Sequence, residues 1–394
     1  MTGICPDIHV PKIGHVTDMN VHPPEKHALI SVEFERGSFY NGTCREADWW
    51  PVVGRVVASW VVDSKTYRAR CKFMIRTFQL LAVLPLLVAV AVAEDTFLTV
   101  EEAGPDYALQ GEYTGEIKHD GQNVQLGLQV IALGDHKFDA VVYPGGLPGE
   151  GWTGTEKFKA HGETKDGQTK VADDEHGHAI LKDGKAILYS KDGTETGTLK
   201  KVERQSKTLG AKPPAGAIVL FDGTSAEQFE RGKITMTDLL AADCETKEKF
   251  GDYKMHIEFR TPFKPTARGQ ERGNSGVYIQ GRYECQVLDS FGLEGENNEC
   301  GGIYSIGKPK VNACFPPLTW QTYDMDFTAA RYAGGKKVTN ARVTIKHNGI
   351  TIHDNLELPH GTPGKNEEAD SPDVIYLQGH GNPVVYRNIW LVKK

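Results

Sequence analysis

Short stretches in which apolar and polar residues alternate with a period of two constrain the fold of this chain most strongly. Residues 253–260 and 276–280 alternate in this way, as do 341–347 and 350–353 on either side of an Asn-Gly pair. Successive side chains of a β-strand point to opposite faces, so each stretch predicts a strand with one buried face. Long amphipathic helices are missing from the sequence. Many such strands joined by glycine turns are typical of a β-sandwich or jelly roll.

A second β-rich region precedes these strands. Asp-Gly pairs recur between short apolar runs, at residues 120–121, 166–167, 183–184 and 192–193. Asp-Gly favours tight hairpins, because glycine accepts a positive φ without a steric clash. We therefore expect a small antiparallel β-rich accessory domain at 94–203, either a spacer or a module in which Trp152 contacts sugar. A polar, Pro-containing linker at 204–216 would lead into the jelly-roll domain at 217–394.

The most apolar segment of the chain resembles a secretory signal peptide. Arg76 precedes an apolar run of 14 residues at 80–93, which is shorter than the roughly 20 residues of a spanning helix. The run ends in the small residues that a signal peptidase accepts, so residues 74–93 predict a signal peptide cleaved near Ala93. Residues 1–73 are then a spurious N-terminal extension. The alternative is an internal membrane anchor behind a small cytoplasmic head.

Export would place the mature protein in the periplasm or outside the cell, with no membrane span. Disulfides are then permitted, and we expect Cys300 to pair with Cys314, although the exported part also contains Cys244 and Cys285 and three pairings stay open. The formal net charge of the whole chain is -7. An acidic chain of this kind argues against a nucleic-acid partner, since such a partner needs basic surface.

Two series of long hydrogen-bonding side chains stand out in the second half of the chain. The first is predicted to line one face of a single strand that spans 274–289, and it comprises Tyr278, Gln280, Arg282, Glu284 and Gln286. The second follows the same alternation near the C-terminus and comprises Gln378, His380 and Asn382. Amide, guanidinium and carboxylate groups suit the recognition of vicinal hydroxyls. We interpret the two series as the wall of a carbohydrate cleft; the alternative is a solvated sheet face.

The same part of the chain resembles a known family, the 3-keto-disaccharide hydrolase domain, which was formerly a domain of unknown function and is common in planctomycete-type secreted proteins. The matching motifs lie at residues 220–224, 250–253, 258–260, 274–278, 280–290, 320–324 and 378–390. The resemblance implies an all-β fold with a concanavalin-like jelly-roll sandwich, and action on sugars oxidised at C3. The chain departs from the family pattern at Phe229, where a tryptophan is usual, and in the loop that carries Cys300 and Cys314.

The residues suggest a mechanism for such a hydrolase. A base would remove the C2 proton that the C3 ketone acidifies, the C1 substituent would leave, and water would then add, so that the net result is hydrolysis. Glu284 and His380 are the predicted base and acid, in either order, and Arg282 would stabilise the enolate. Hydroxyl groups of the sugar substrate would be held by Tyr278, Gln280, Gln286, Gln378 and Asn382. We assign no cofactor, although a divalent cation held by a carboxylate, a histidine and Asp289 stays open.

Each assignment has a structural alternative. Glu284 and Arg282 could form an ion pair that only stabilises the fold, and His380 could be a hydrogen-bonding loop residue. A non-catalytic carbohydrate-binding module of lectin-like fold is the alternative function, because a fold does not decide function. A direct glycosidase with two carboxylates is a weaker prediction, since no second acid accompanies Glu284. The aglycone, the linkage and the choice between hydrolase and lyase stay open.

Overall fold

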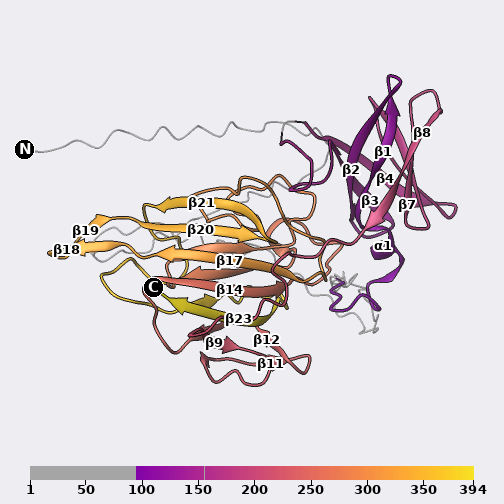
Figure 1. Cartoon of the computed structure of the whole chain (residues 1–394). Helices are drawn as coiled ribbons and strands as arrows, with labels where there is room; N and C mark the ends of the chain where they lie inside the picture. Colours follow the sequence, from indigo (N-terminus) through magenta and orange to yellow (C-terminus); the bar gives the residue numbers. More distant parts are fainter. Residues whose placement is uncertain (1–94, 155) are drawn as a thin grey trace, which may run out of the picture. The chain divides into compact units, whose positions relative to one another are not determined.

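The computed structural model describes residues 95–154 and 156–394 (Figure 1). The predicted extension at 1–73 and signal peptide at 74–93 lie outside the described residues. Helical structure in the described part is confined to the short α-helix α1 (Gly104–Leu109) and one turn of 3₁₀-helix, η1 (Gly269–Glu271). Neither of these is long and apolar enough to cross a membrane. The rest of the regular structure is strand, which confirms the predicted all-β class.

The first eight strands close into an antiparallel barrel, in which each strand pairs with the next and β8 returns to β1. Their bounds are β1 Gly111–His119, β2 Gln122–Ala132, β3 Lys137–Pro144, β4 Phe158–Lys165, β5 Gln168–Asp173, β6 Gly177–Lys182, β7 Lys185–Tyr189 and β8 Glu195–Val202. Asp120, Asp166 and Asp183 begin three of its hairpin turns, and all three have a positive φ. The Asp-Gly pairs therefore act as the predicted turns.

The remaining strands form a sandwich of two sheets and a small hairpin. The five-stranded sheet has the order β10 (Phe229–Glu230), β13 (Cys244–Thr246), β22 (Tyr376–Leu377), β15 (Ser275–Ile279) and β16 (Tyr283–Val287). The eight-stranded sheet has the order β11 (Ile234–Thr235), β12 (Leu239–Ala241), β23 (Val385–Lys393), β14 (Tyr253–Arg260), β17 (Gln321–Thr328), β20 (Ala341–His347) and β21 (Ile350–Leu358), with β9 (Ile218–Phe221) paired to β23. The hairpin consists of β18 (Arg331–Ala333) and β19 (Lys336–Thr339).

The core of the sandwich is built by the alternation seen in the sequence. On β14, Tyr253, Met255, Ile257 and Phe259 join the buried cluster between the sheets, while the residues between them point to the other face. The Asn-Gly pair forms the turn between β20 and β21, as predicted, with positive φ at both residues. These strands confirm the predicted β-sandwich.

The predicted single strand at 274–289 is wrong, because the chain turns back within it. β15 ends at Ile279 and β16 begins at Tyr283, and the two pair as an antiparallel hairpin. Gln280 and Gly281 have φ of 54° and 60°, in the left-handed region that reverses the chain. The polar side chains of this segment therefore belong to two neighbouring strands and the turn between them.

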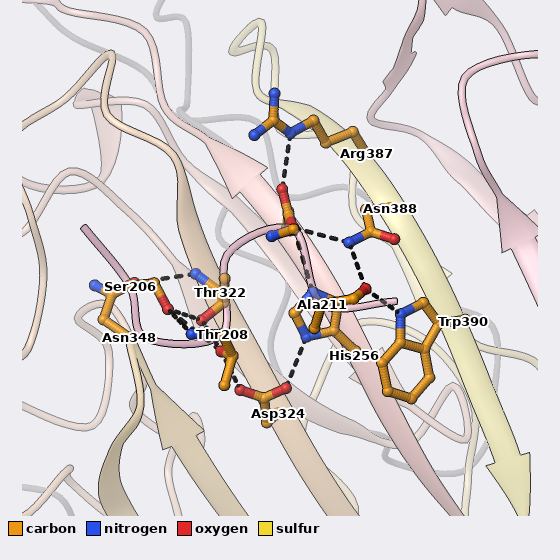
Figure 2. Close-up of polar contacts among 12 residues, drawn as sticks. Ser206, Thr208, Ala211, His256, Thr322, Asp324, Asn348, Arg387, Asn388 and Trp390 are labelled. Carbon is orange, nitrogen blue, oxygen red and sulfur yellow. Dashed lines mark hydrogen bonds and ion pairs between the residues drawn. The ribbon is translucent and has the colours of Figure 1, made fainter. Parts of the chain in front are cut away.

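The predicted linker at 204–216 is bound to the outer face of the eight-stranded sheet (Figure 2). Thr208 Oγ1 donates a hydrogen bond of 2.6 Å to Asp324 Oδ2. The backbone N–H of Gly210 donates to Glu258 Oε1 at 2.6 Å. The carbonyl oxygen of Ala211 accepts two hydrogen bonds of 3.1 Å from side chains of β23. The segment has no strand or helix of its own, yet its polar groups are fixed on the sheet.

Beneath this segment lies a polar cluster that we call the His256 network, formed by His256, Glu258, Asp324, Arg387 and Asn388. The His256 ring is fully buried, with Nδ1 2.7 Å from Asp324 Oδ1 and Nε2 3.4 Å from Glu258 Oε1. Burial alone would lower the pKa of His256, but the hydrogen bonds to the two carboxylates raise it. Burial alone would raise the pKa of Glu258, but hydrogen bonds led by that from His256 lower it to about 2.

The predicted disulfide between Cys300 and Cys314 is wrong. All four cysteines in the described part of the chain are buried free thiols. Cys300 Sγ lies 3.2 Å from Tyr323 Oη, and Cys314 Sγ donates to the carbonyl of Phe315 at 3.4 Å. The two thiols also interact with each other, so they share hydrogen bonds inside the apolar core, where an uncharged thiol behaves as a small hydrophobic group.

Candidate functional site

A cavity of about 290 Å³ lies at the five-stranded sheet, on the face opposite the sandwich core. Its lining residues come from β15, β16 and the loops around them, and are Gln270, Asn274, Tyr278, Glu284, Gln286, Asn298, Tyr304, Pro363, Gly364, Gln378 and His380. Small-molecule pockets typically measure roughly 300–1,000 Å³, so this cavity has the size for one sugar ring. Its lining is mostly amide, hydroxyl and carboxyl groups.

The register of the β15–β16 hairpin determines which side chains reach the cavity. Tyr278 pairs with Glu284, and Gly276 pairs with Gln286, so these four positions share one face of the sheet. Gly276 has no side chain, and a Cβ atom there would overlap the Glu284 carboxylate. A glycine at this position therefore leaves the space that the Glu284 carboxyl group occupies.

Glu284 is the only carboxyl group among the described residues that line the cavity, and its ionisation is strongly perturbed. Only 4% of the residue is exposed to solvent. Burial raises the pKa of Glu284 to about 7, although a hydrogen bond from Tyr278 acts to lower it. A carboxyl group with a pKa near neutrality can either accept or donate a proton at physiological pH.

Tyr278 lies at the centre of the polar contacts in the cavity. Its hydroxyl group is 3.0 Å from Glu284 Oε2 and 3.0 Å from the carbonyl oxygen of Pro363, and it accepts a 3.5 Å hydrogen bond from Gln378 Nε2. Burial, followed by the negative charge of Glu284, raises the pKa of Tyr278, so the phenol stays protonated and remains a donor. Gly364 has a φ of 110°, and a Cβ there would lie 2.8 Å from the Tyr278 hydroxyl.

Three amide oxygens at the cavity have no hydrogen-bond partner. They belong to Asn274, Gln286 and Gln378, and all three are buried. Burying an unpaired acceptor is costly, so native structures usually satisfy such atoms with water or a ligand. Unpaired acceptors on residues that line one cavity suit a ligand with several O–H donors, which is what a sugar presents.

The structure brings five of the eight predicted site residues together at this cavity. They are Tyr278, Glu284, Gln286, Gln378 and His380. His380 is exposed and lies in the loop that follows β22, rather than on the alternating strand that we expected. Its role and that of the other four stay predictions, supported by their common position.

The other three predicted residues do not line this cavity. Gln280 is in the hairpin turn, and its Nε2 donates to the carbonyl of Phe250 at 2.9 Å. Asn382 lines a separate cavity of about 390 Å³, and its Oδ1 accepts a hydrogen bond from Lys264. Alternation predicts a cleft position for Gln280 only if the strand continues without a turn, and for Asn382 only if a strand covers 378–382, where the structure has a loop.

Arg282 is likewise held away from the cavity. It is buried, and its guanidinium donates to the carbonyl oxygens of Glu367 and Ser371, each at 3.1 Å. Its Nη2 atom lies 3.5 Å from Asp373 Oδ2. Arg282 thus pairs with Asp373 rather than with Glu284, and it fixes the 367–373 loop instead of facing a substrate.

The arrangement does not form the cation site that the sequence left open. Asp289 is buried and accepts a 2.7 Å hydrogen bond from Arg272 Nε, so it is not directed at Glu284 and His380. No group of three or more His, Cys, Asp or Glu residues within 95–154 and 156–394 is placed to hold a metal ion. We therefore derive no step through a metal.

Sequence reasoning missed half of the cavity lining. Gln270 lies in η1, and Asn298, Tyr304, Pro363 and Gly364 lie in loops; alternation can place none of them. Asn274 lies two residues before Gly276 in the same motif, and this was the only local signal for it. The remaining loops reach the cavity through tertiary packing.

Comparison with known proteins gives one family and a few solved structures. Residues 216–392 match the 3-keto-alpha-glucoside-1,2-lyase-like domain. A crystal structure of a candidate glycosyl hydrolase from Parabacteroides distasonis is 32% identical, over 46% of this chain and 85% of that chain, with a TM-score of 0.43. Two others from the same organism are 16% and 19% identical over 45% of this chain and 94% and 99% of theirs, each with a TM-score of 0.33. No curated protein matches the sequence.

Proposed function

We propose that this chain, which belongs through residues 216–392 to the 3-keto-alpha-glucoside-1,2-lyase-like family, cleaves 3-keto-glycosides. The proposed reaction is elimination followed by hydration. The family gives the chain a carbohydrate-active role. The observation that carries the finer proposal is a single one: a carboxyl group with a pKa of about 7 lies in a polar cavity lined by unpaired amide oxygens.

In the proposed first step, the Glu284 carboxylate removes the proton from C2 of the sugar. The electrons of the C2–H bond form a C1=C2 double bond, and the bond from C1 to the leaving oxygen breaks. His380 gives a proton to that oxygen. The ketone at C3 is what makes the C2 proton acidic enough for a carboxylate base of this pKa, so an unoxidised sugar would not react.

Charge that develops on the C3 oxygen needs a donor, and we assign this role to Tyr278 in place of Arg282. Its phenol is kept protonated by burial and lies beside Glu284. In the second step, His380 takes a proton from water as the water oxygen bonds to C1, and Glu284, which exchanges its proton with solvent between the two steps, protonates C2. The unpaired oxygens of Asn274, Gln286 and Gln378 would accept hydrogen bonds from the sugar hydroxyls.

The test compares a 3-keto disaccharide with its unoxidised parent. We expect the protein to release a 3-keto sugar from the first and nothing from the second. Glu284→Gln should lower kcat/KM by about 10²–10⁴-fold, the usual contribution of a general base. Glu357→Gln, an exposed glutamate on β21, is the matched control and should keep full activity.

The alternative function is a non-catalytic carbohydrate-binding module, and the same experiment separates the two. Binding of both sugars without any product, with affinity unchanged in Glu284→Gln, would establish the module and exclude the enzyme. For localisation we propose export with cleavage near Ala93, on the support of the signal-peptide pattern at 74–93 alone.

A further inference from the structure

Two arginines meet over one tryptophan on the outer face of the eight-stranded sheet, which is the sheet that does not carry the cavity. The guanidinium carbon of Arg387 lies 3.9 Å from the centre of the Trp320 ring, and that of Arg260 lies 5.1 Å from it. Arg260 pairs with Val385 across β14 and β23, and Arg387 pairs with Glu258. The two arginines are thus diagonal neighbours on adjacent strands.

Little negative charge opposes this pair. Arg387 donates through Nε to Glu258 Oε2 at 2.7 Å, while its two terminal nitrogens have no hydrogen-bond partner among the described residues (Figure 2). Arg260 makes a single hydrogen bond within the same part of the chain, from Nη2 to the sulfur of Met236 at 3.7 Å. No acidic side chain of the described residues forms an ion pair with Arg260, although the charge of Asp238 acts on it from a distance.

This arrangement has an electrostatic cost. Burial, followed by repulsion from Arg387, lowers the pKa of the Arg260 guanidinium, which is half-buried. The face of Trp320 offsets part of the cost, because a ring quadrupole attracts cations. The Trp320 ring supplies no hydrogen-bond acceptors for the unpaired guanidinium N–H groups, whereas an oxyanion would supply them. Guanidinium groups match the oxygens of carboxylate, sulfate and phosphate groups in geometry as well as charge.

We propose that Arg260 and Arg387 form a binding site for an oxyanion, with Trp320 holding the two guanidiniums in place. The ligand is either the carboxylate of a sugar acid or a free inorganic oxyanion, since both present the same group. This site lies outside the sugar cavity, so it goes beyond the proposed function and does not depend on it.

The experiment is isothermal titration calorimetry of the full chain with sodium sulfate and with sodium glucuronate at constant ionic strength. It measures the affinity for each anion. Sodium chloride and glucose are the reference solutes. We expect an oxyanion to bind the wild-type protein, and Arg260→Gln to weaken binding by roughly tenfold or more, the equivalent of one charge-assisted hydrogen bond. Tighter binding of glucuronate than of sulfate identifies a sugar acid, and binding of sulfate that is equal or tighter identifies a free oxyanion.

Two further variants test whether a loss of binding in Arg260→Gln comes from misfolding. Arg260→Lys keeps the charge but loses the planar fork, so its affinity should lie between those of wild type and Arg260→Gln. Arg342→Gln removes an exposed arginine that pairs with Glu357, and it should bind as the wild type does. Heats no larger than those with chloride overturn the proposal, as does equal affinity in Arg260→Gln and wild type.

Discussion

Glu284 lies in surroundings that disfavour its charge yet keep it within reach of a ligand. The residue is almost fully buried, and among the described residues no arginine or lysine contacts its carboxyl group. Without a cation nearby, desolvation is the dominant influence and raises the pKa to about 7. By contrast, Glu258 is equally buried but accepts hydrogen bonds from Arg387, Asn388 and Gly210, and its pKa is lowered to about 2. Two buried glutamates on opposite sheets therefore have opposite chemistry.

The pH dependence of cleavage follows from the pKa of Glu284. A base must be ionised, so kcat/KM should rise with pH through about 7. Tyr278→Phe removes the hydrogen bond that lowers this pKa, so the rise should move to higher pH, together with a lower maximal rate. Tyr189→Phe in the barrel is the control and should leave the profile in place. A Tyr278→Phe profile with an unmoved midpoint would show that Glu284 is not the titrating base.

The β15–β16 hairpin is the element that assembles the site, because it places a glycine opposite Gln286 and next to Glu284. We expect Gly276→Ala to displace the Glu284 carboxyl group, since the new Cβ would overlap it. Activity should fall at least about tenfold, a loss of about 1.4 kcal/mol of transition-state stabilisation, while the chain still folds. Gly251→Ala is the matched control, because its Cβ would meet nothing within 4 Å. Full activity in Gly276→Ala would contradict the assigned position of Glu284.

The same hairpin shows how far the sequence could predict the site. Alternation identified β14 with its bounds, because each inward position there is apolar and each outward one polar. Within 274–289 the alternation continues through the turn, so it predicts one shared face for Gln280, Arg282 and Glu284. Gly281 was the signal for the reversal, but Gln280 is an unusual residue for a left-handed conformation, which asparagine and aspartate adopt more often.

Loops limited the prediction of the cavity. Tyr278, Glu284 and Gln286 could be predicted together because a strand fixes the direction of its side chains. Tyr304 and Asn298 could not, since no local pattern tells where a loop will pack. The cysteines show a further limit: proximity in the sequence suggests a disulfide, while the fold brings Cys300 and Cys314 together as free thiols.

On the scale of the whole molecule, the His256 network joins segments that are far apart in the sequence. Linker residues 208–211, β14, β17 and β23 all contribute to it (Figure 2). No motif identified this network, because its members become neighbours only when the sheet forms and the linker covers it. The ionisation of this network should make the free energy of unfolding depend on pH.

The sign of this effect follows from His256. Its pKa is raised in the folded state, so its contribution to the free energy of unfolding is complete below about pH 6.5 and is lost as the pH rises through the folded pKa. The free energy of unfolding of the wild type should therefore decline as the pH rises from about 6.5 through the folded pKa of His256. His256→Gln should lower stability by about 1–3 kcal/mol at pH 6 and remove most of the decline.

Chemical denaturation at several pH values measures both quantities. His119→Gln, which replaces an exposed histidine of the barrel, is the control and should change neither. An equal pH dependence in wild type and His256→Gln would show that His256 does not hold a proton between the two carboxylates.

The central claim, removal of the C2 proton in the cavity of Glu284, is tested most directly with a 3-keto disaccharide that carries deuterium at C2. We predict slower cleavage of the labelled substrate by the wild-type protein, and loss of the label to solvent during turnover. Cleavage at the same rate, with deuterium kept at C2 of the released sugar, would contradict the account.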